Sequence, residues 1–241
     1  LGVGDEDIFP GPNWVSGSQT ILRVGEPVGN FYGFERIGTW GTDEAAEAAA
    51  AGRIPGEAKR STDRRIIGNG LPDFTGSFIN EVNFRNFDFM LDLQFVIGSD
   101  IMQQFLHTAE DRQALTNGLA TQLEDAWTEN NQDTPIQRIR HQPISGQNTQ
   151  ADSHWIVDGS YIRGNLIQLG YNFDPSVMES LGLTQLRVAA RVENAFVIDD
   201  PNFKGHDPEA SSWGGNIHAQ NIFFYQYPRP RTFSLGVSLQ F

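Results

Sequence analysis

The chain has 241 residues, of which 39% are hydrophobic, and its formal net charge is −13. This acidic balance argues against a nucleic-acid partner, because nucleic-acid binding requires a basic face. Cysteine is absent, which excludes disulfides and thiolate chemistry, and no run of about 18 apolar residues indicates a transmembrane helix. A membrane-spanning β-barrel stays compatible with this composition, because its strands alternate and give only a weak hydropathy signal.

Seven segments show the alternation of apolar and polar residues that is typical of half-buried β-strands. They cover residues 19–24, 30–40, 74–84, 87–98, 167–173, 186–192 and 233–241. The first two form a weaker hairpin around Gly25-Glu26-Pro27, and the next two form a stronger hairpin with the tight link Arg85-Asn86. The last segment alternates without exception and ends on Phe241. Its length suits a tilted strand in a barrel wall, which needs about 9–11 residues.

The connections between these segments alternate between short and long. In an antiparallel arrangement, this alternation brings the short turns to one end of the sheet and the long loops to the other. Outer-membrane barrels have this organisation, whereas turns in soluble β-sandwiches are more evenly spaced. The sequence therefore predicts an all-β chain, with about seven strands of a large antiparallel transmembrane β-barrel. Helices are expected in the long loops, at residues 43–51 before Gly52 and at residues 108–127.

Residues suited to catalysis or to metal binding are present but scattered. None of the five histidines forms a close metal-binding pair, and the sequence has no nucleotide-binding or nucleophile-elbow motif. The carboxylates Asp199-Asp200 and Asp207-Pro208-Glu209 lack the spacing of a glycosidase pair, and an Asp-Pro turn is favoured. Asp63-Arg64-Arg65 does not supply the several oxygen ligands of a calcium loop. We therefore expect no enzyme activity, no metal and no cofactor.

Aromatic residues in the long loops are the best candidates for contact with a ligand. Trp127 and Trp213 lie in the middle of their loops, and Tyr225 lies in an aromatic stretch. Such rings stack on sugars or on peptide side chains, but they also pack loops together or form an interfacial belt. Both interpretations stay open, with packing favoured for any single ring. Asp88 and Arg187 fall on polar strand faces, which would line a barrel lumen or contact solvent.

Several motifs run through the chain in a specific order. They are Gly25-Glu26-Pro27-Val28-Gly29-Asn30-Phe31-Tyr32-Gly33-Phe34, Asp63-Arg64-Arg65-Ile66-Ile67-Gly68-Asn69, Asp158-Gly159-Ser160-Tyr161-Ile162-Arg163, Leu169-Gly170-Tyr171, Asn194-Ala195-Phe196 and Gly205-His206-Asp207-Pro208-Glu209. In this order they resemble the C-terminal part of SusC/RagA-type TonB-dependent outer-membrane transporters. His206 departs from the pattern, since it replaces the usual tyrosine.

This resemblance implies that residues 1–241 form a C-terminal segment of the barrel, either as a piece of a longer chain or as a subunit that completes a barrel with another chain. The plug and the earlier strands are not in this sequence. The parent protein would lie in the lipid of the bacterial outer membrane and import oligosaccharides or peptides. A SusD-like surface lipoprotein would cover the outer loops. The TonB complex would act through the N-terminal part, which this sequence does not contain.

The resemblance also implies roles for particular residues. Asp207, Pro208 and Glu209 are expected to form a structural loop motif, and Phe233 and Phe241 to serve as the barrel-assembly signal. Three alternatives to this interpretation are a soluble β-rich glycan-binding module, an enzyme and a porin-like barrel piece. The first would explain the loop aromatics but not the alternating connections, the second lacks a catalytic constellation, and the third would not share the ordered motifs.

Overall fold

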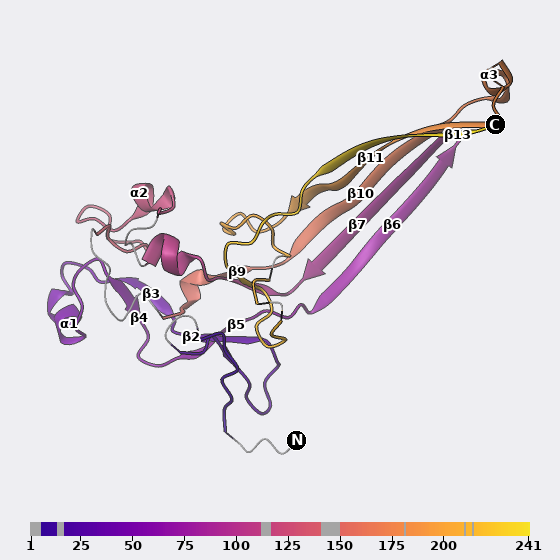
Figure 1. Ribbon diagram of the computed structural model, residues 1–241. Coiled ribbons are helices and arrows are strands. Elements are labelled where there is room, and N and C mark those ends of the chain that lie inside the picture. The colour runs from indigo at the N-terminus through magenta and orange to yellow at the C-terminus, as the bar shows by residue number, and fades with distance from the viewer. Residues whose placement is uncertain are drawn as a thin grey trace.

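The computed structural model describes residues 6–13, 17–111, 117–140, 150–180, 182–209, 211–213 and 215–241. It consists of two parts (Figure 1). The long sheet is an antiparallel sheet formed by strands β6, β7, β10, β11 and β13. The loop lobe comprises the described residues within 6–73, 98–160 and 199–231, and it lies at one end of the long sheet (Figure 1).

The long sheet has five strands in the spatial order β13-β11-β10-β7-β6, and every neighbouring pair is antiparallel. Its strands are β6 (Phe74–Phe84), β7 (Phe87–Ile97), β10 (Tyr161–Asn172), β11 (Gln185–Ile198) and β13 (Thr232–Gln240). The alternating sequence and the many aromatic and β-branched residues favour an extended backbone in each strand. The five corresponding strand predictions are confirmed.

The register of the long sheet gathers the apolar residues on one face. Val82 pairs with Phe89, Phe89 with Leu169, Leu169 with Ala190, and Ala190 with Leu235, so that one row crosses all five strands. The four large side chains in this row are 37 to 75% exposed. Exposed apolar surface that continues from strand to strand is unusual for a protein in water and indicates a face that another apolar medium or partner covers.

The opposite face of the long sheet is polar and contains an ion pair that spans β10. Arg187 on β11 donates to both carboxylate oxygens of Asp88 on β7, over 3.1 and 2.5 Å. Gly170 lies between them on β10, paired with Asp88 on one side and with Ala189 on the other. An added Cβ at Gly170 would collide with both charged groups, so the ion pair requires a glycine at this position.

The connections of the long sheet separate by length, as predicted. The two-residue turn between β6 and β7, where Arg85 has φ +53°, lies at the same end as α3 (Pro175–Ser180) and the C-terminus (Figure 1). The long β7–β10 and β11–β13 connections both leave from the opposite end and enter the loop lobe. Within the long sheet, the prediction that short turns and long loops lie at opposite ends is confirmed. It is wrong for the short turn at Gly25 to Gly29, which joins β1 (Thr20–Ile21) and β2 (Asn30–Gly33) in the loop lobe.

The weaker predicted hairpin exists, but it lies in the loop lobe. β1 (Thr20–Ile21) and β2 (Asn30–Gly33) are antiparallel, and β5 (Arg65–Asn69) pairs with β2 to complete a small sheet. Both residues of β1 are buried, so this segment lacks the wet face that its alternating pattern suggested. Of the seven predicted strands, five therefore belong to the long sheet in the described part of the chain.

The loop lobe also contains short strands and helices. Its remaining elements are β3 (Arg36–Thr39), α1 (Ala45–Ala50), β4 (Ala58–Arg60), β8 (Asp100–Gln103), η1 (His107–Asp111), α2 (Thr121–Asp125), η2 (Ser153–Trp155), β9 (Ile156–Asp158) and β12 (Ile222–Phe223). The helix predicted before Gly52 is confirmed as α1. The prediction of a continuous helix over 108–127 is wrong, because residues 117–119, between η1 and α2, are not helical. Residues 112–116 lie outside the described range. None of the described helices is long and apolar enough to cross a membrane.

A shared hydrophobic core joins the three segments of the loop lobe. Phe31 comes from the first segment, Met102 and Leu106 from the second, and Ile222 and Phe223 from the third, and all of them are buried in one cluster. β8 pairs with β9 and, in parallel, with β12, which brings the second and third segments together. The three loops therefore pack as one body.

Substitution of Gly170 by alanine is expected to break the Asp88–Arg187 ion pair and to destabilise the long sheet. The added methyl group would force both charged side chains to move. As at other overpacked sites, this should lower the free energy of unfolding by about 1–3 kcal/mol. Thermal unfolding of the full-length protein in detergent measures this effect. Gly236→Ala is the matched control, because a Cβ there meets only the Ala189 carbonyl oxygen, at 3.9 Å. Equal melting temperatures for the two variants would contradict the prediction.

Candidate functional site

Two positive and two negative side chains lie together, buried, in the loop lobe. Nη2 of Arg36 lies 2.7 Å from a carboxylate oxygen of Asp111 and 2.7 Å from one of Asp152. Arg60 pairs with Asp152 and lies 3.8 Å from Asp111. The exposed fraction of these side chains is 3% or less. We call Arg36, Arg60, Asp111 and Asp152 the buried charge cluster; its charges balance, which limits the several kcal/mol that each isolated buried ion would cost.

Asp111 also has hydrogen-bond partners outside the buried charge cluster. Its carboxylate accepts hydrogen bonds from Gln137 Nε2 at 2.7 Å and from Trp155 Nε1 at 2.9 Å. Burial by itself would raise the pKa of Asp111, but the charges of Arg36 and Arg60 outweigh burial and hold this pKa well below its ordinary value. Asp111 is therefore an anion in the folded lobe and connects strands β3 and β4 to the β7–β10 connection.

A second buried carboxylate, Glu110, brings in the third segment. It contacts His154 Nε2, and its other oxygen lies 3.1 Å from Nζ of Lys204. Burial would raise the pKa of Glu110, but its hydrogen bond and charge interaction with His154, and the charge of Lys204, lower it overall. Lys204 belongs to the β11–β13 connection, so ionic contacts join the same segments as the hydrophobic core does.

The predicted motif Asp207-Pro208-Glu209 lies where the loop lobe meets the long sheet. Asp207 is 4% exposed and accepts a hydrogen bond from the guanidinium group of Arg163, which lies on β10. Glu209 lies 3.2 Å from Nε of Arg163. Arg163 also donates to the side chain of Asn194 on β11. Three of the sequence motifs thus meet at one arginine, which supports a structural role for this loop.

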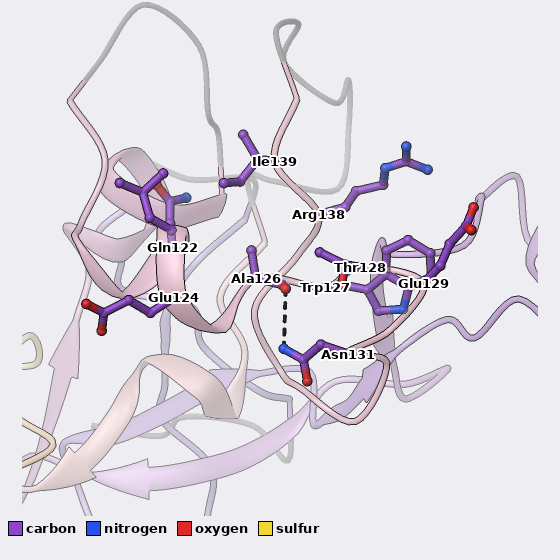
Figure 2. Close-up of a pocket in the computed structure, with 10 residues that line it drawn as sticks. Gln122, Glu124, Ala126, Trp127, Thr128, Glu129, Asn131, Arg138 and Ile139 are labelled. Carbon is purple, nitrogen blue, oxygen red and sulfur yellow. Dashed lines mark hydrogen bonds between the residues drawn. The ribbon is translucent and has the colours of Figure 1, made fainter.

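A pocket of about 380 Å³ lies beside α2 (Figure 2). Trp127 forms part of its wall and is 6% exposed, and the guanidinium carbon of Arg138 lies 5.6 Å from the centre of the indole ring. Glu124 and Glu129 are exposed at opposite sides of the pocket (Figure 2). Asn131 Nδ2 donates to the Ala126 carbonyl oxygen at 3.4 Å.

The chemistry of this pocket is that of a polar site. The indole Nε1 of Trp127 is buried, and no described residue accepts a hydrogen bond from it. Gly56 lies against the ring, since a Cβ there would come within 2.7 Å of it, and Arg138 lies over the ring as well. Trp127 is therefore packed against Gly56 and Arg138 and, at 6% exposed, has little free ring surface.

The other two aromatic candidates lie at the shared core. Trp213 is partly buried against this core and donates from Nε1 to Gln104 Oε1 at 2.9 Å. Tyr225 is 55% exposed, with its ring centre 5.7 Å from that of Phe105. The structure thus brings Trp213 and Tyr225 onto the same core, to which Trp127 does not belong.

The two terminal phenylalanines lie far apart on the surface. Phe233 is on the apolar face of β13 and is 73% exposed. Phe241 follows β13 at the short-turn end and is 87% exposed (Figure 1). Neither residue contributes to the pocket beside α2.

The buried charge cluster gave no recognisable sequence signal. Arg36 and Asp152 are separated by 116 positions along the chain, and no local periodicity relates them. Arg163 and Asp207, in contrast, both belong to motifs that the sequence showed, and their opposite charges could have suggested the contact between them.

Replacement of Asp111 by asparagine is expected to loosen the loop lobe and leave the long sheet unchanged. The variant leaves the buried guanidinium groups of Arg36 and Arg60 with one carboxylate instead of two. This change should lower the free energy of unfolding by about 3–5 kcal/mol. Hydrogen–deuterium exchange of the full-length protein should show loss of protection in the lobe alone. Asp133→Asn, at an exposed position in the same lobe, is the matched control.

The pH dependence of the stability of the loop lobe follows from the direction in which the pKa of Asp111 is shifted. A carboxyl group whose folded pKa is lowered stabilises the fold at every pH above its unfolded value of about 3.9, and this stabilisation is lost as the pH falls through the lower folded value. The difference in protection between wild type and Asp111→Asn should therefore be constant from about pH 7 to 5 and should shrink only in stronger acid. A difference that disappears near neutral pH would refute this account.

Sequence comparison finds relatives among TonB-dependent receptors, and no family model matches the chain. TonB-dependent receptor P3 of Formosa agariphila is 31% identical over 254 residues, which cover 98% of this chain and 24% of that protein. TonB-dependent receptor SusC of Bacteroides thetaiotaomicron is 29% identical over 187 residues, which cover 75% of this chain and 16% of SusC. The chain thus spans less than a quarter of the length of these curated relatives.

Solved structures of the RagAB peptide importer share the fold. The open-open state matches with a TM-score of 0.69 and 20% identity over 100% of this chain and 25% of that chain. The closed-closed state matches with a TM-score of 0.67 and 22% identity over 92% of this chain and 24% of that chain. These structures show the fold alone, and the curated relatives identify the chain as a segment of a SusC/RagA-type TonB-dependent receptor.

Proposed function

We propose that the chain forms part of the wall and of the outer loops of a TonB-dependent importer in a bacterial outer membrane. The exposed apolar face of the long sheet is the observation that carries this proposal. Phe89, Leu169 and Leu235 are 37%, 50% and 75% exposed in one row, and lipid covers such a face in a barrel wall. A soluble glycan-binding module would leave this face in water, which disfavours that alternative.

The two ends of the long sheet suggest an orientation in the membrane. Barrels of this class have short turns on the periplasmic side and long loops outside, so we assign the loop lobe to the cell surface. β6 and β13 each pair on one side only within the described residues. Because lipid does not satisfy free backbone groups at a sheet edge, further strands, from the same chain or from another, must pair with both in this proposal.

The proposal that the chain is part of a TonB-dependent importer also suggests its partners and its substrate. The related solved structures are described as a peptide importer, and we propose peptides or oligosaccharides as the substrate class here. In this proposal a SusD-like surface lipoprotein covers the loop lobe, and the TonB complex acts through a plug that lies in another part of the protein. The curated relatives are named TonB-dependent receptors, and we propose no catalytic step.

The candidate residues divide between transport and assembly in this proposal. Trp127, Trp213 and Tyr225 are candidates for substrate contact, and Tyr225 is the most exposed of the three. Phe233 and Phe241 lie exposed in and after the last strand, where the barrel-assembly machinery could bind them.

Fractionation of cells that make the full-length protein tests the proposal. The protein should reach the outer-membrane fraction and should be released by detergent but not by high salt, since lipid holds its apolar face. A SusD-like lipoprotein should copurify with it. Recovery of the protein as a water-soluble monomer would overturn the proposal.

The proposed role of Tyr225 can be tested by uptake of labelled peptides and oligosaccharides. The Tyr225→Ala variant should lower uptake several-fold at limiting substrate and leave the amount of protein in the outer membrane unchanged. Tyr227→Ala is the control, because Tyr227 lies two positions away, is 95% exposed and shares no described ring contact with Phe105. Equal uptake by both variants would exclude Tyr225 as a contact residue.

A further inference from the structure

Tyr225 has a backbone conformation that an aromatic residue rarely adopts. Its φ is +50°, in the left-handed region, where the Cβ atom of any residue other than glycine is crowded. Among the described residues other than glycine, positive φ also occurs at Arg85, Asn194 and Asn221, and asparagine tolerates it best. Such a conformation persists only where the surrounding contacts hold it, and it is most frequent at ligand-binding and catalytic sites. The contacts around Tyr225 therefore bear on its proposed role.

Side chains hold the backbone on both sides of Tyr225. The hydroxyl of Ser212 accepts a hydrogen bond from the Phe224 amide nitrogen at 2.6 Å and donates one to the Phe224 carbonyl oxygen at 3.0 Å. The side-chain amide of Gln226 donates to the carbonyl oxygen of Ser211 at 3.0 Å. The residues before and after Tyr225 are thus both attached to the same pair of serines.

The ring of Tyr225 lies on an aromatic support. Its centre is 5.7 Å from that of Phe105 and 4.8 Å from that of Phe224, which are ordinary distances for paired rings. Phe105 is 4% exposed and belongs to the shared core, whereas Tyr225 is 55% exposed. A backbone that left the left-handed region would move the ring away from Phe105. The hydrogen bonds of Ser212 therefore also determine where the exposed part of the ring lies.

We propose that Ser212 is a positioning residue for the contact of Tyr225 with the substrate. Its hydroxyl fixes Phe224 and thereby holds the adjacent Tyr225 ring in place before the substrate arrives. A group that is ordered in advance loses less conformational entropy on binding, so preorganisation raises affinity. Ser212 acts in this way only if Tyr225 contacts the substrate, so the inference rests on the proposed function.

Hydrogen–deuterium exchange of the full-length protein without substrate tests the hydrogen bonds. Ser212→Ala removes both of them and should speed exchange at the Phe224 amide, whereas Ser212→Thr keeps a hydroxyl and should not. Ser211→Ala is the matched control, because the Ser211 hydroxyl contacts the Ala219 carbonyl oxygen at 3.5 Å and the variant retains the carbonyl group that binds Gln226. Equal exchange in Ser212→Ala and wild type would overturn the positioning role.

Uptake kinetics test the link to the substrate. Labelled peptides and labelled oligosaccharides are supplied separately to cells that carry equal amounts of each variant in the outer membrane. For the probe that the wild type takes up, Ser212→Ala should raise the KM of uptake roughly 3- to 10-fold, as expected for one or two lost hydrogen bonds, and leave the maximal rate unchanged. Ser212→Thr and Ser211→Ala should keep the wild-type KM.

The double variant Ser212→Ala and Tyr225→Ala separates positioning from a purely structural role. If Ser212 acts through Tyr225, the double variant should have the KM of Tyr225→Ala alone, whereas independent effects would multiply. Multiplied effects, or a raised KM in Ser211→Ala, would overturn the inference. A wild-type KM in Tyr225→Ala would overturn it together with the contact role of Tyr225. The importer assignment survives either result if the protein still fractionates with the outer membrane.

Discussion

Backbone hydrogen bonds join the five strands of the long sheet in one register, and a shift of one residue in any pair would exchange its apolar and polar faces. This register places Leu169 in an apolar row and, one residue later, Gly170 beneath the Asp88–Arg187 ion pair. Both long connections leave from the same end of the ladder, so their position, too, depends on the order and direction of these strands (Figure 1).

The loop lobe is organised by a different kind of contact. Its strands and helices are short, and its segments are joined by a shared hydrophobic core and by buried ions of balanced charge. Asp111 links strands β3 and β4 to the β7–β10 connection, and the adjacent Glu110 reaches Lys204 in the β11–β13 connection. Removal of one such charge leaves its partners buried and uncompensated, so the lobe depends on each of these pairs more than an exposed surface would.

The sequence was most informative where a local period determines the structure. The alternation over Phe74–Phe84 and Phe87–Ile97 predicted both strands and their turn, because a β-strand repeats every two residues. It was misleading at Thr20–Ile21, where the same pattern occurs in a short strand that is buried in the lobe. The contacts of Asp111 were out of reach, because they join positions that only the folded chain brings together. Trp127 was named as a candidate for ligand contact from its residue type and its place in a long loop, and no sequence pattern indicated the pocket beside it.

The long-range contacts of the lobe bear on the order in which the protein folds. Hairpin β6–β7 needs only neighbouring residues, whereas the lobe contains a hydrogen bond from Asn216 to Pro10, which are 206 positions apart. Contacts between distant positions form slowly, because the intervening chain must first be ordered. The lobe therefore reaches its final packing only after the β11–β13 connection is in place, and a nascent chain that ends before Lys204 would carry Glu110 without its lysine partner.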